Sequence, residues 1–393
     1  MRQAKIIIGS SYGDEGKGLA AAHAVRTLGG RCLNVRINGG AQRGHTVDLP
    51  DGRRHVFHHF GSGSFDGAVS CADRDFILNP LLYADERKAL AERFGVAPEL
   101  TASTRCRVTL PWDMMVGQII EESRGAARHG SCGCGIYETI LRYRNTDWAL
   151  DLGTLARTGW TDFRAACRRI AAEYLPARLG GMGVTPDGEW QALLNSEGLI
   201  ERTWEDLRDM LREVRLYDDW TDAARGFDHL VFEAGQGLAL DAENRVDFPH
   251  LTPSRTTSLI SARRVAALPG DTRTEVVYVT RSYLTRHGAG PFPTECPKAE
   301  INPDMMDRTN VPNPHQQTLR YGHFDGAAVL GRVRADLAAT RRVLPEVASA
   351  ALVTHLNETG GALDGDMELA TFAAAFDRAM VSDTPCAVRD WML

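Results

Sequence analysis

The sequence lacks the features that mark membrane-spanning, disulfide-rich and nucleic-acid-binding proteins. No apolar run reaches the roughly 18 residues that a membrane-spanning helix needs. The formal net charge is −6, so there is no basic excess to favour nucleic acid. Eight cysteines in 393 residues are too few for a disulfide framework. We therefore expect a protein of the reducing cytoplasm, in which residues 1–4 lead directly into a strand without a signal-peptide pattern.

What remains is the composition of an ordinary globular protein with many glycine-rich turns. Hydrophobic residues make up 43% of the chain and charged residues 24%, and the length is enough to bury a substantial core. Cys132 and Cys134 are the one close pair of cysteines. Their single intervening residue is too short for a usual zinc motif, so we interpret this stretch as a glycine-rich loop.

The most informative stretch is residues 5–18. Three consecutive isoleucines predict a buried strand, four glycines follow between Gly9 and Gly18, and an alanine-rich helical pattern comes next. A strand, a glycine-rich turn and a helix together form a cradle for nucleotide phosphates, because backbone N–H groups and the positive end of the helix face the anion. Lys17 would add positive charge there, and Asp14 a carboxylate for a metal ion or a proton.

The spacing of this turn differs from two common phosphate-binding loops. A Walker A loop would need glycine where Ser11 stands and serine or threonine in place of Gly18. A dinucleotide fingerprint would need a third glycine at Ala21. From the turn alone, a tight connection with a surface lysine stays open as the alternative.

Further strands lead into glycine-rich turns and predict an α/β fold with a central, mostly parallel sheet flanked by helices. The core is predicted to be P-loop-like and nucleotide-binding, with a helical insertion. The predicted domains are residues 1–150, the helical insertion 151–225 and the remainder of the core, 226–393. Other predicted elements are strands at 32–37, 54–60, 230–238, 274–280 and 351–354, and helices at 79–94, 327–340 and 366–380.

Four separated segments, in this order, resemble the adenylosuccinate synthetase family. They are Gly-Asp-Glu-Gly-Lys-Gly at 13–18, Gly-Gly-x-x-x-Gly-His-Thr at 39–46, Phe-Glu-x-x-Gln-Gly at 232–237 and Gly-Ala-Gly-Pro-Phe-Pro-Thr-Glu at 288–295. The first and last strings are specific, and the resemblance spans nearly the whole chain. It implies an enzyme that joins L-aspartate to the 6-position of IMP, using GTP and Mg²⁺.

The resemblance also implies roles for single residues. Asp14 would take the N1 proton of the purine, and His45 would stabilise the phosphate in transfer. Lys17 and Gln236 complete the implied catalytic set, and Asp14 with the Gly44 carbonyl would bind Mg²⁺. The implied nucleotide-binding residues are Gly13, Glu15, Gly16, Lys17, Gly18, Gly44, Thr46, His355 and Asn357. The implied substrate-binding residues are Gln42, Ser131, Cys132, Arg144, Gln236, Thr252, Thr318 and Arg320.

The family also implies a homodimer, in which an arginine reaches the nucleotide of the neighbouring subunit. Arg142 and Arg144 are the two candidates for that arginine, and neither aligns cleanly with the family pattern.

Two departures from the family concern specificity. The family reads guanine with Thr-Lys-x-Asp, where this chain has Thr354-His-Leu-Asn357. An amide cannot accept from two donors as a carboxylate does, so we expect ATP or a loosely selected nucleotide as the phosphate donor. The arginine-rich aspartate loop is thinned, with Arg320 the clearest survivor in residues 310–322. One arginine still clamps a carboxylate, so an aspartate-like amine donor is retained.

Three functions therefore stay open. The first is condensation of aspartate with an IMP-like nucleotide, favoured by Asp14, because variants that aminate deoxyguanylate typically replace this aspartate. The second is a specialised reaction on dGMP or a purine-analogue nucleotide, favoured by the thinned arginines. The third is a non-catalytic nucleotide-binding homologue, which would have little use for both Asp14 and His45.

Overall fold

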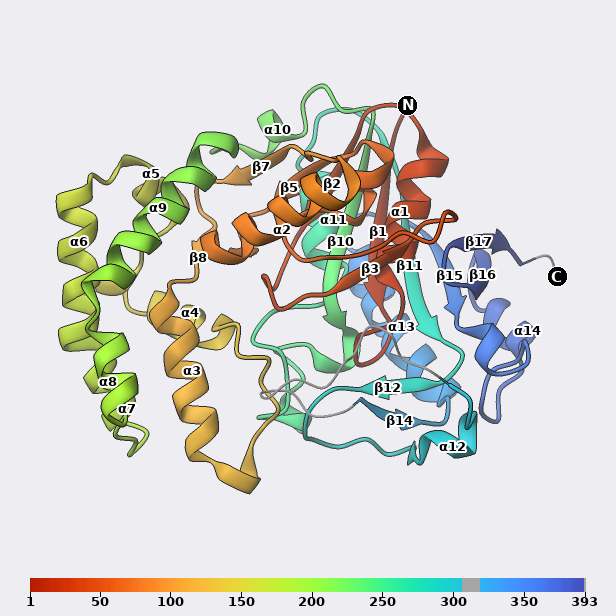
Figure 1. Cartoon of the computed structure of the whole chain (residues 1–393). Helices are drawn as coiled ribbons and strands as arrows, with labels where there is room; N and C mark the ends of the chain where they lie inside the picture. The colour runs from red at the N-terminus through yellow and green to blue at the C-terminus, as the bar shows by residue number, and fades with distance from the viewer. Residues whose placement is uncertain (306–318, 392–393) are drawn as a thin grey trace.

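A ten-stranded sheet runs through the protein, seen here in a computed structural model that describes residues 1–305 and 319–391 (Figure 1). Every neighbouring pair is parallel except β16 and β17, so the predicted mostly parallel sheet is confirmed. In spatial order the strands are β17 (Ala387–Asp390), β16 (Arg378–Thr384), β15 (Ala348–Thr354), β11 (Thr272–Arg281), β1 (Arg2–Gly9), β10 (His229–Gly237), β2 (Cys32–Arg36), β5 (Val69–Ala72), β7 (Leu100–Ser103) and β9 (Arg215–Tyr217).

Smaller sheets and helices surround this sheet. The short strands are β3 (His45–Asp48), β4 (Arg54–Phe57), β6 (Ile77–Leu78), β8 (Arg107–Val108), β12 (Leu284–Arg286), β13 (Glu295–Cys296) and β14 (Arg320–Gly322). The helices are α1 (Lys17–Leu28), α2 (Pro80–Phe94), α3 (Pro111–Ser123), α4 (Ile136–Tyr143), α5 (Leu152–Arg157), α6 (Trp160–Arg169), α7 (Leu175–Gly180), α8 (Gly188–Leu194), α9 (Glu197–Glu213), α10 (Trp220–Ala223), α11 (Leu259–Ala266), α12 (Lys298–Ile301), α13 (Gly326–Arg341) and α14 (Leu369–Ala373). In the described part of the chain, no helix combines the length and apolarity of a membrane span.

Strand β1 is buried on both faces, which explains its run of isoleucines. Ile6 and Ile8 belong to the hydrophobic cluster that contains Val333 of α13. Ile7, which points to the other face of the sheet, packs in the cluster that contains Ala21 of α1. All three isoleucines are fully buried, and each contributes about 1.5–3 kcal/mol relative to an exposed side chain. The sheet is therefore covered by helices on both faces.

Helices α5 to α9 form the yellow-green part of the chain at the left of Figure 1. Their apolar residues share one hydrophobic cluster with α2 and α3, with Trp112 and Phe163 among its fully buried members. Sequence reasoning predicted a helical insertion over residues 151–225, and it missed strand β9, which extends the large sheet beside β7.

The predicted helix at 366–380 is wrong. Only Leu369–Ala373 is helical, and the chain then enters strand β16 at Arg378. The reason is tertiary: β16 pairs in parallel with β15, and Met380 and Val381 become buried against the sheet. The alanine-rich pattern predicted helix from local preference, but pairing at the edge of the sheet outweighs it.

Candidate active site

The loops that carry the predicted site residues leave the same edge of the sheet. β1, β10 and β2 are parallel neighbours, with Ile7 opposite Glu233 and Glu233 opposite Arg36. The turn with Asp14 follows β1, the loop with His45 follows β2, and Gln236 lies at the end of β10. Ligands of open α/β sheets bind outside the carboxyl ends of the strands, so this edge is the candidate site.

The turn between β1 and α1 is shaped by an internal ion pair. The Glu15 carboxylate accepts hydrogen bonds from the backbone N–H groups of Ser11 (2.8 Å) and Gly13 (3.1 Å), and Lys17 Nζ lies 2.6 Å from its other oxygen. A side chain at Gly9 would place its Cβ only 2.1 Å from Glu15 Oε2, which explains the glycine. Both Lys17 and Glu15 are buried. The Glu15 carboxylate therefore stabilises the conformation of the turn and does not face solvent.

Asp14 is held at the tip of this turn by an arginine that sequence reasoning missed. Its backbone is left-handed, with φ of 61°, a conformation that aspartate tolerates better than most residues. Arg281, at the end of β11, donates from Nε to the Asp14 carbonyl (2.6 Å) and from Nη2 to the Asp14 carboxylate. The carboxylate is therefore fixed in direction before any ligand binds.

His45 belongs to a buried charge cluster on the floor of the site. Its Nδ1 is hydrogen-bonded to the carboxylate of Glu233, which also forms a 2.6 Å ion pair with Arg36. Ser62 donates to the same carboxylate from both its hydroxyl and its backbone N–H. Because Glu233 accepts at Nδ1, it fixes the tautomer in which Nδ1 carries the proton and Nε2 is free to act.

Burial determines the charges in this cluster. Burial lowers the pKa of His45, and the attraction of Glu233 does not fully compensate because Arg36 and Arg43 add positive charge nearby. Burial opposes ionisation of Glu233 as well, yet Arg36 and His45 outweigh it and keep the pKa of this carboxyl below its ordinary range. At neutral pH the cluster therefore consists of an ionised Glu233 beside a neutral His45.

We expect the lowered pKa of His45 to make the folded state acid-sensitive. The unfolded chain takes up a proton on this histidine below pH of about 6.5, while the folded protein does not. This contribution to stability is complete above that pH and is lost as the pH falls, with a slope of up to about 1.4 kcal/mol per pH unit. Urea unfolding at several pH values measures the free energy of unfolding, which should fall less steeply with decreasing pH in His45→Asn than in the parent protein. Identical slopes in the two proteins would contradict the assignment of a neutral His45.

Two glycine contacts bring the three loops together. A Cβ at Gly18 would lie 2.4 Å from the Thr46 carbonyl oxygen, so the start of α1 packs directly on the His45–Thr46 backbone. A Cβ at Gly13 would lie 3.2 Å from Gln236 Oε1. Gln236 is itself left-handed, with φ of 63°, where the register of β1 and β10 shifts. The Asp14, His45 and Gln236 loops therefore converge on the amino terminus of α1.

The segment predicted to read the nucleotide base is tied to Asp14 by hydrogen bonds. Arg281 donates to the Tyr283 hydroxyl (2.7 Å), which in turn donates to Glu358, the neighbour of the exposed Asn357. His355 is left-handed, and its Nδ1 lies 2.8 Å from the Thr354 hydroxyl. Burial, assisted by Arg281, lowers the pKa of His355, so its ring is neutral.

The Thr354 hydroxyl also reaches the turn predicted to bind phosphates. It donates to the carbonyl oxygen of Glu15 at 2.9 Å, and this hydrogen bond anchors the start of the segment predicted to read the base to the turn before α1.

The loop with Ser131 and Cys132 packs against the conspicuous Gly288–Glu295 string. Backbone N–H groups of Gly130 and Ser131 donate to Glu121, and a Cβ at Gly130 would lie 2.9 Å from the Cα of Gly288. A hydrogen bond from the Cys134 thiol lowers the pKa of Cys132. The loop with the predicted substrate residues Ser131 and Cys132 and the Gly288–Glu295 string are thus in backbone contact.

The predicted arginines occupy different surroundings. Arg320 forms an ion pair with Glu295 and donates to the carbonyls of Gly288 and Gly290 (both 3.0 Å). Arg142 is fully buried and ion-paired with Asp113 at 2.8 Å, so it is unavailable to a neighbouring subunit. This excludes one of the two candidates for the shared-site arginine.

The other predicted substrate residues lie as follows. Arg144 is exposed at the end of α4, and Thr252 is buried, with its backbone N–H donating to Leu240. Thr318 lies outside the described residues.

Buried oxygens around the site have no partner within the described part of the chain. They are Gln42 Oε1 and Thr46 Oγ1, which flank the exposed Gly44. Mg²⁺ prefers carboxylate, carbonyl and hydroxyl oxygens, and such atoms are what this loop and Asp14 offer. The residues present therefore fit a magnesium ion bound together with a nucleotide phosphate.

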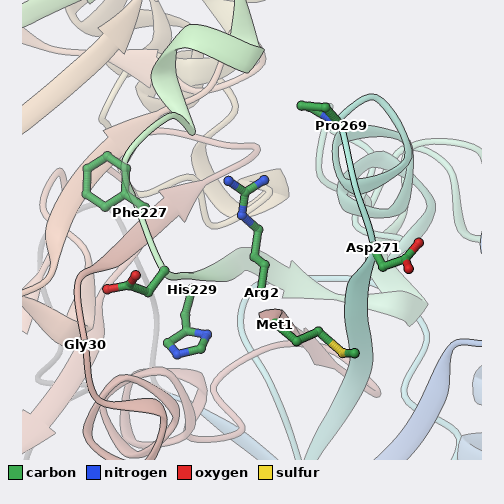
Figure 2. A pocket seen from close by; sticks show the side chains of 8 residues that line it. Met1, Arg2, Gly30, Phe227, His229, Pro269 and Asp271 are labelled. Atoms are coloured by element: carbon green, nitrogen blue, oxygen red, sulfur yellow. The ribbon is translucent and has the colours of Figure 1, made fainter.

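A separate cavity lies at the opposite edge of the sheet (Figure 2). Arg2, His229 and Asp271 line it where β1, β10 and β11 begin. The eight residues of β1 span about 25 Å, so this cavity is remote from Lys17. The His229 side chain in this cavity has a structural role, because its Nδ1 accepts a hydrogen bond from the backbone N–H of Gln3.

Three charged residues of this site received no role from sequence reasoning: Glu233, Arg36 and Arg281. Glu233 stands inside the quoted Phe-Glu-x-x-Gln-Gly string, and each arginine ends a strand of apolar residues. The sequence signal that could have identified these residues is a charged residue at or near the end of a buried strand. Burying a charge costs free energy unless the charge is paired, so such a residue indicates a buried partner.

The fold and these loops define a nucleotide-using α/β enzyme. The sequence profile of the adenylosuccinate synthetase family matches residues 6–339. An adenylosuccinate synthetase of Vibrio parahaemolyticus is 31% identical over 355 residues, covering 86% of this chain and 73% of that protein. The chain belongs to the adenylosuccinate synthetase family and is a ligase that forms a C–N bond.

Two solved structures share the fold. Fully ligated adenylosuccinate synthetase from Plasmodium falciparum aligns with a TM-score of 0.66 and 20% identity, over 90% of this chain and 77% of that one. Cyanophage S-2L succinoaminodeoxyadenylate synthetase, bound to dGMP and to dATP as an energy donor, aligns with a TM-score of 0.60 and 16% identity. That alignment covers 99% of this chain and 95% of the cyanophage protein.

Proposed function

We propose that this protein condenses L-aspartate with the 6-oxo position of an IMP-like purine nucleoside monophosphate, at the expense of a nucleoside triphosphate. The observation that supports this most is the convergence of the Asp14 turn and the His45 loop on the start of α1, beside the buried Lys17. A phosphate at the amino terminus of α1 would lie between a carboxylate and an imidazole. That is the arrangement needed to phosphorylate an oxygen.

In the first proposed step, Asp14 removes the N1 proton of the purine and the 6-oxygen becomes nucleophilic. The 6-oxygen attacks the γ-phosphorus, and the bond to the nucleoside diphosphate breaks. In the second step the aspartate amine attacks C6, and the 6-oxygen leaves as inorganic phosphate. Lys17 and the backbone amides of the turn hold the phosphates, and Mg²⁺, when bound by Asp14 and Gly44, supplies charge neutralisation at the transferred group.

His45 has a defined part in this scheme. In the free protein it is neutral, with Nδ1–H donating to Glu233. An arriving phosphate brings negative charge next to Nε2 and favours protonation of the ring. The imidazolium, held between Glu233 and the phosphate, then donates to the transferred group.

We propose ATP as the phosphate donor. The Watson–Crick edge of guanine presents two donors, which match a carboxylate, whereas adenine presents one donor and one acceptor, which match an amide. Asn357 is exposed beside Glu358 in the base-reading segment and has an amide to offer.

Asn357→Asp is accordingly expected to move the ratio of kcat/KM for GTP and ATP towards GTP by about 10-fold to 100-fold, since a hydrogen bond to a charged group contributes about 1.5–3 kcal/mol. Steady-state kinetics with each nucleotide measure the ratio. The matched control is Asn195→Asp, an exposed asparagine of the helical part, which leaves the ratio unchanged. A ratio that does not respond to Asn357→Asp would remove this residue from base recognition.

The second candidate is a reaction on dGMP or on a purine-analogue nucleotide. It is supported by the thinned arginines of the aspartate loop and by the fold alignment over nearly the whole length of the cyanophage enzyme. Phosphate release measured with IMP, dGMP and a purine-analogue monophosphate, each with aspartate, separates the candidates. Release with IMP alone supports the first proposal, release with dGMP supports the second, and no release with any acceptor would favour a non-catalytic homologue.

The proposed assembly is a homodimer in the cytoplasm. With Arg142 buried in its own subunit, Arg144 is the remaining candidate for an arginine that reaches a partner's site.

A further inference from the structure

A cluster of metal-ligating side chains lies outside the site described above, where β13, α12 and β14 meet. Cys296 Sγ, a Glu300 carboxylate oxygen and a His323 ring nitrogen all lie within 4.8 Å of one another. Cys296 is half-buried, while Glu300 is exposed, so the cluster is open to an ion from solvent. We propose that Cys296, Glu300 and His323 form a zinc-binding site.

Local folding places these three residues together. In the antiparallel pair of β13 and β14, Cys296 lies opposite Tyr321, and the backbone N–H of His323 donates to Thr294 (2.9 Å). Cys296 and His323 are therefore diagonal neighbours on one face of the small sheet. Glu300 follows in α12, a short helix that packs beside β14 (Figure 1).

The histidine is oriented as a metal ligand. Its Nδ1 lies 2.9 Å from the carboxylate of Asp364, and its Nε2 lies 3.7 Å from Glu300 Oε2. Asp364 fixes the proton on Nδ1 and directs the Nε2 lone pair towards Cys296 and Glu300. A carboxylate behind the ligating imidazole is the usual outer partner of zinc-bound histidine.

Distances and donor types favour zinc over the magnesium of the proposed reaction. In tetrahedral geometry, zinc bonds of about 2.0–2.3 Å place the ligand atoms roughly 3.3–3.8 Å apart. Small rotations of the three side chains would bring their ligand atoms from the present positions to these separations. Thiolate and imidazole select zinc, whereas Mg²⁺ takes oxygen ligands. Water completes the fourth position.

Such an ion would act as a structural cross-link. Its ligands come from β13 (Cys296), α12 (Glu300) and the residue that follows β14 (His323), so binding ties these elements together. β13 and β14 also carry Glu295 and Arg320, the ion pair beside the Gly288–Gly290 carbonyls. Metal binding would thus rigidify the frame that holds Arg320, without taking part in the chemistry.

Cobalt substitution tests the site in the full-length protein. Co²⁺ binds zinc sites and reports thiolate ligation by a charge-transfer band in the near-ultraviolet. Titration of the metal-free, reduced protein with Co²⁺ in excess Mg²⁺, which occupies oxygen-only sites, is expected to produce that band, and Zn²⁺ should abolish it. Cys296→Ser is expected to lose the band, and His323→Gln to lose its tetrahedral visible absorption.

Two matched variants make the result specific. Asp364→Asn, which keeps all three ligands, is expected to weaken Co²⁺ affinity by about 10-fold to 100-fold. A variant with Cys132→Ser and Cys134→Ser, which lacks the other close pair of thiols, should keep the band. Circular dichroism checks that each variant is folded. The proposal is overturned by the absence of a thiolate band in the parent protein, by its persistence in Cys296→Ser or by its loss in the Cys132/Cys134 variant. Each of these outcomes is independent of the acceptor, the donor and the turnover of the enzyme.

Discussion

Asp14→Asn is expected to lower turnover by about 10²-fold to 10⁴-fold, the usual contribution of a positioned general base. Asparagine keeps the size of the side chain and an oxygen for the guanidinium of Arg281, but it cannot take a proton. The proposed binding of the nucleotide phosphates by Lys17 and the turn amides should persist, because the substitution leaves the Lys17–Glu15 ion pair in place. Phosphate release and calorimetric nucleotide affinity, measured side by side, separate the two effects.

A control for Asp14 is available in Asp66, which ends the short helical turn Ser62–Asp66 and pairs with Arg26 of α1. Asp66 also accepts two hydrogen bonds from one arginine, Arg26, but it lies in an exposed ion pair away from the loops. Asp66→Asn should keep parental turnover. If Asp14→Asn turned over at the parental rate as well, the base assignment would be wrong, whatever the family resemblance implies.

Glu233→Gln is expected to damage both stability and catalysis. The substitution leaves the fully buried Arg36 without its ionic partner, and breaking a buried pair costs about 3–5 kcal/mol. It also removes the carboxylate that holds His45 in one tautomer and stabilises its charged form. We expect turnover to fall by about 10²-fold or more at temperatures where the variant is folded. Urea unfolding and steady-state kinetics measure the two losses.

Glu86 provides the matched control for Glu233. It is a buried glutamate that accepts hydrogen bonds from the backbone of His58 and His59 and from the His59 ring. Burial opposes its ionisation, yet hydrogen bonds from His55 and His59 outweigh burial and keep its pKa below the ordinary value. Glu86→Gln should therefore lower the free energy of unfolding without the loss of turnover that we expect for Glu233→Gln. Equal turnover losses in the two variants would show that Glu233 acts through the fold alone.

The part of the site that the sequence predicted is the part made from local segments. The turn at Gly13–Gly18 and the loop at Gly39–Thr46 each follow a predicted strand, and parallel strands bring their carboxyl ends to one edge. This inference does not require the order of the strands in the sheet. Asp14 and His45 lie at the same carboxyl edge of the sheet, as predicted, and their catalytic roles remain predictions.

The partners of these residues were beyond sequence reasoning because they are distant in the chain. Arg281 is 267 residues from Asp14, and Glu233 is 188 residues from His45. Periodicity reports which residues are buried, but it does not report which buried charge meets which. The same limit explains the false helix at 366–380, where pairing with β15 decides the structure.

The fate of the purine 6-oxygen tests the central claim most directly. An IMP carrying ¹⁸O at position 6 is supplied with ATP, Mg²⁺ and aspartate, and the released phosphate is analysed by mass spectrometry. The account predicts that the label moves from the purine to inorganic phosphate as the aspartate amine takes its place. Unlabelled phosphate, formed together with a purine that keeps its 6-oxygen, would contradict it.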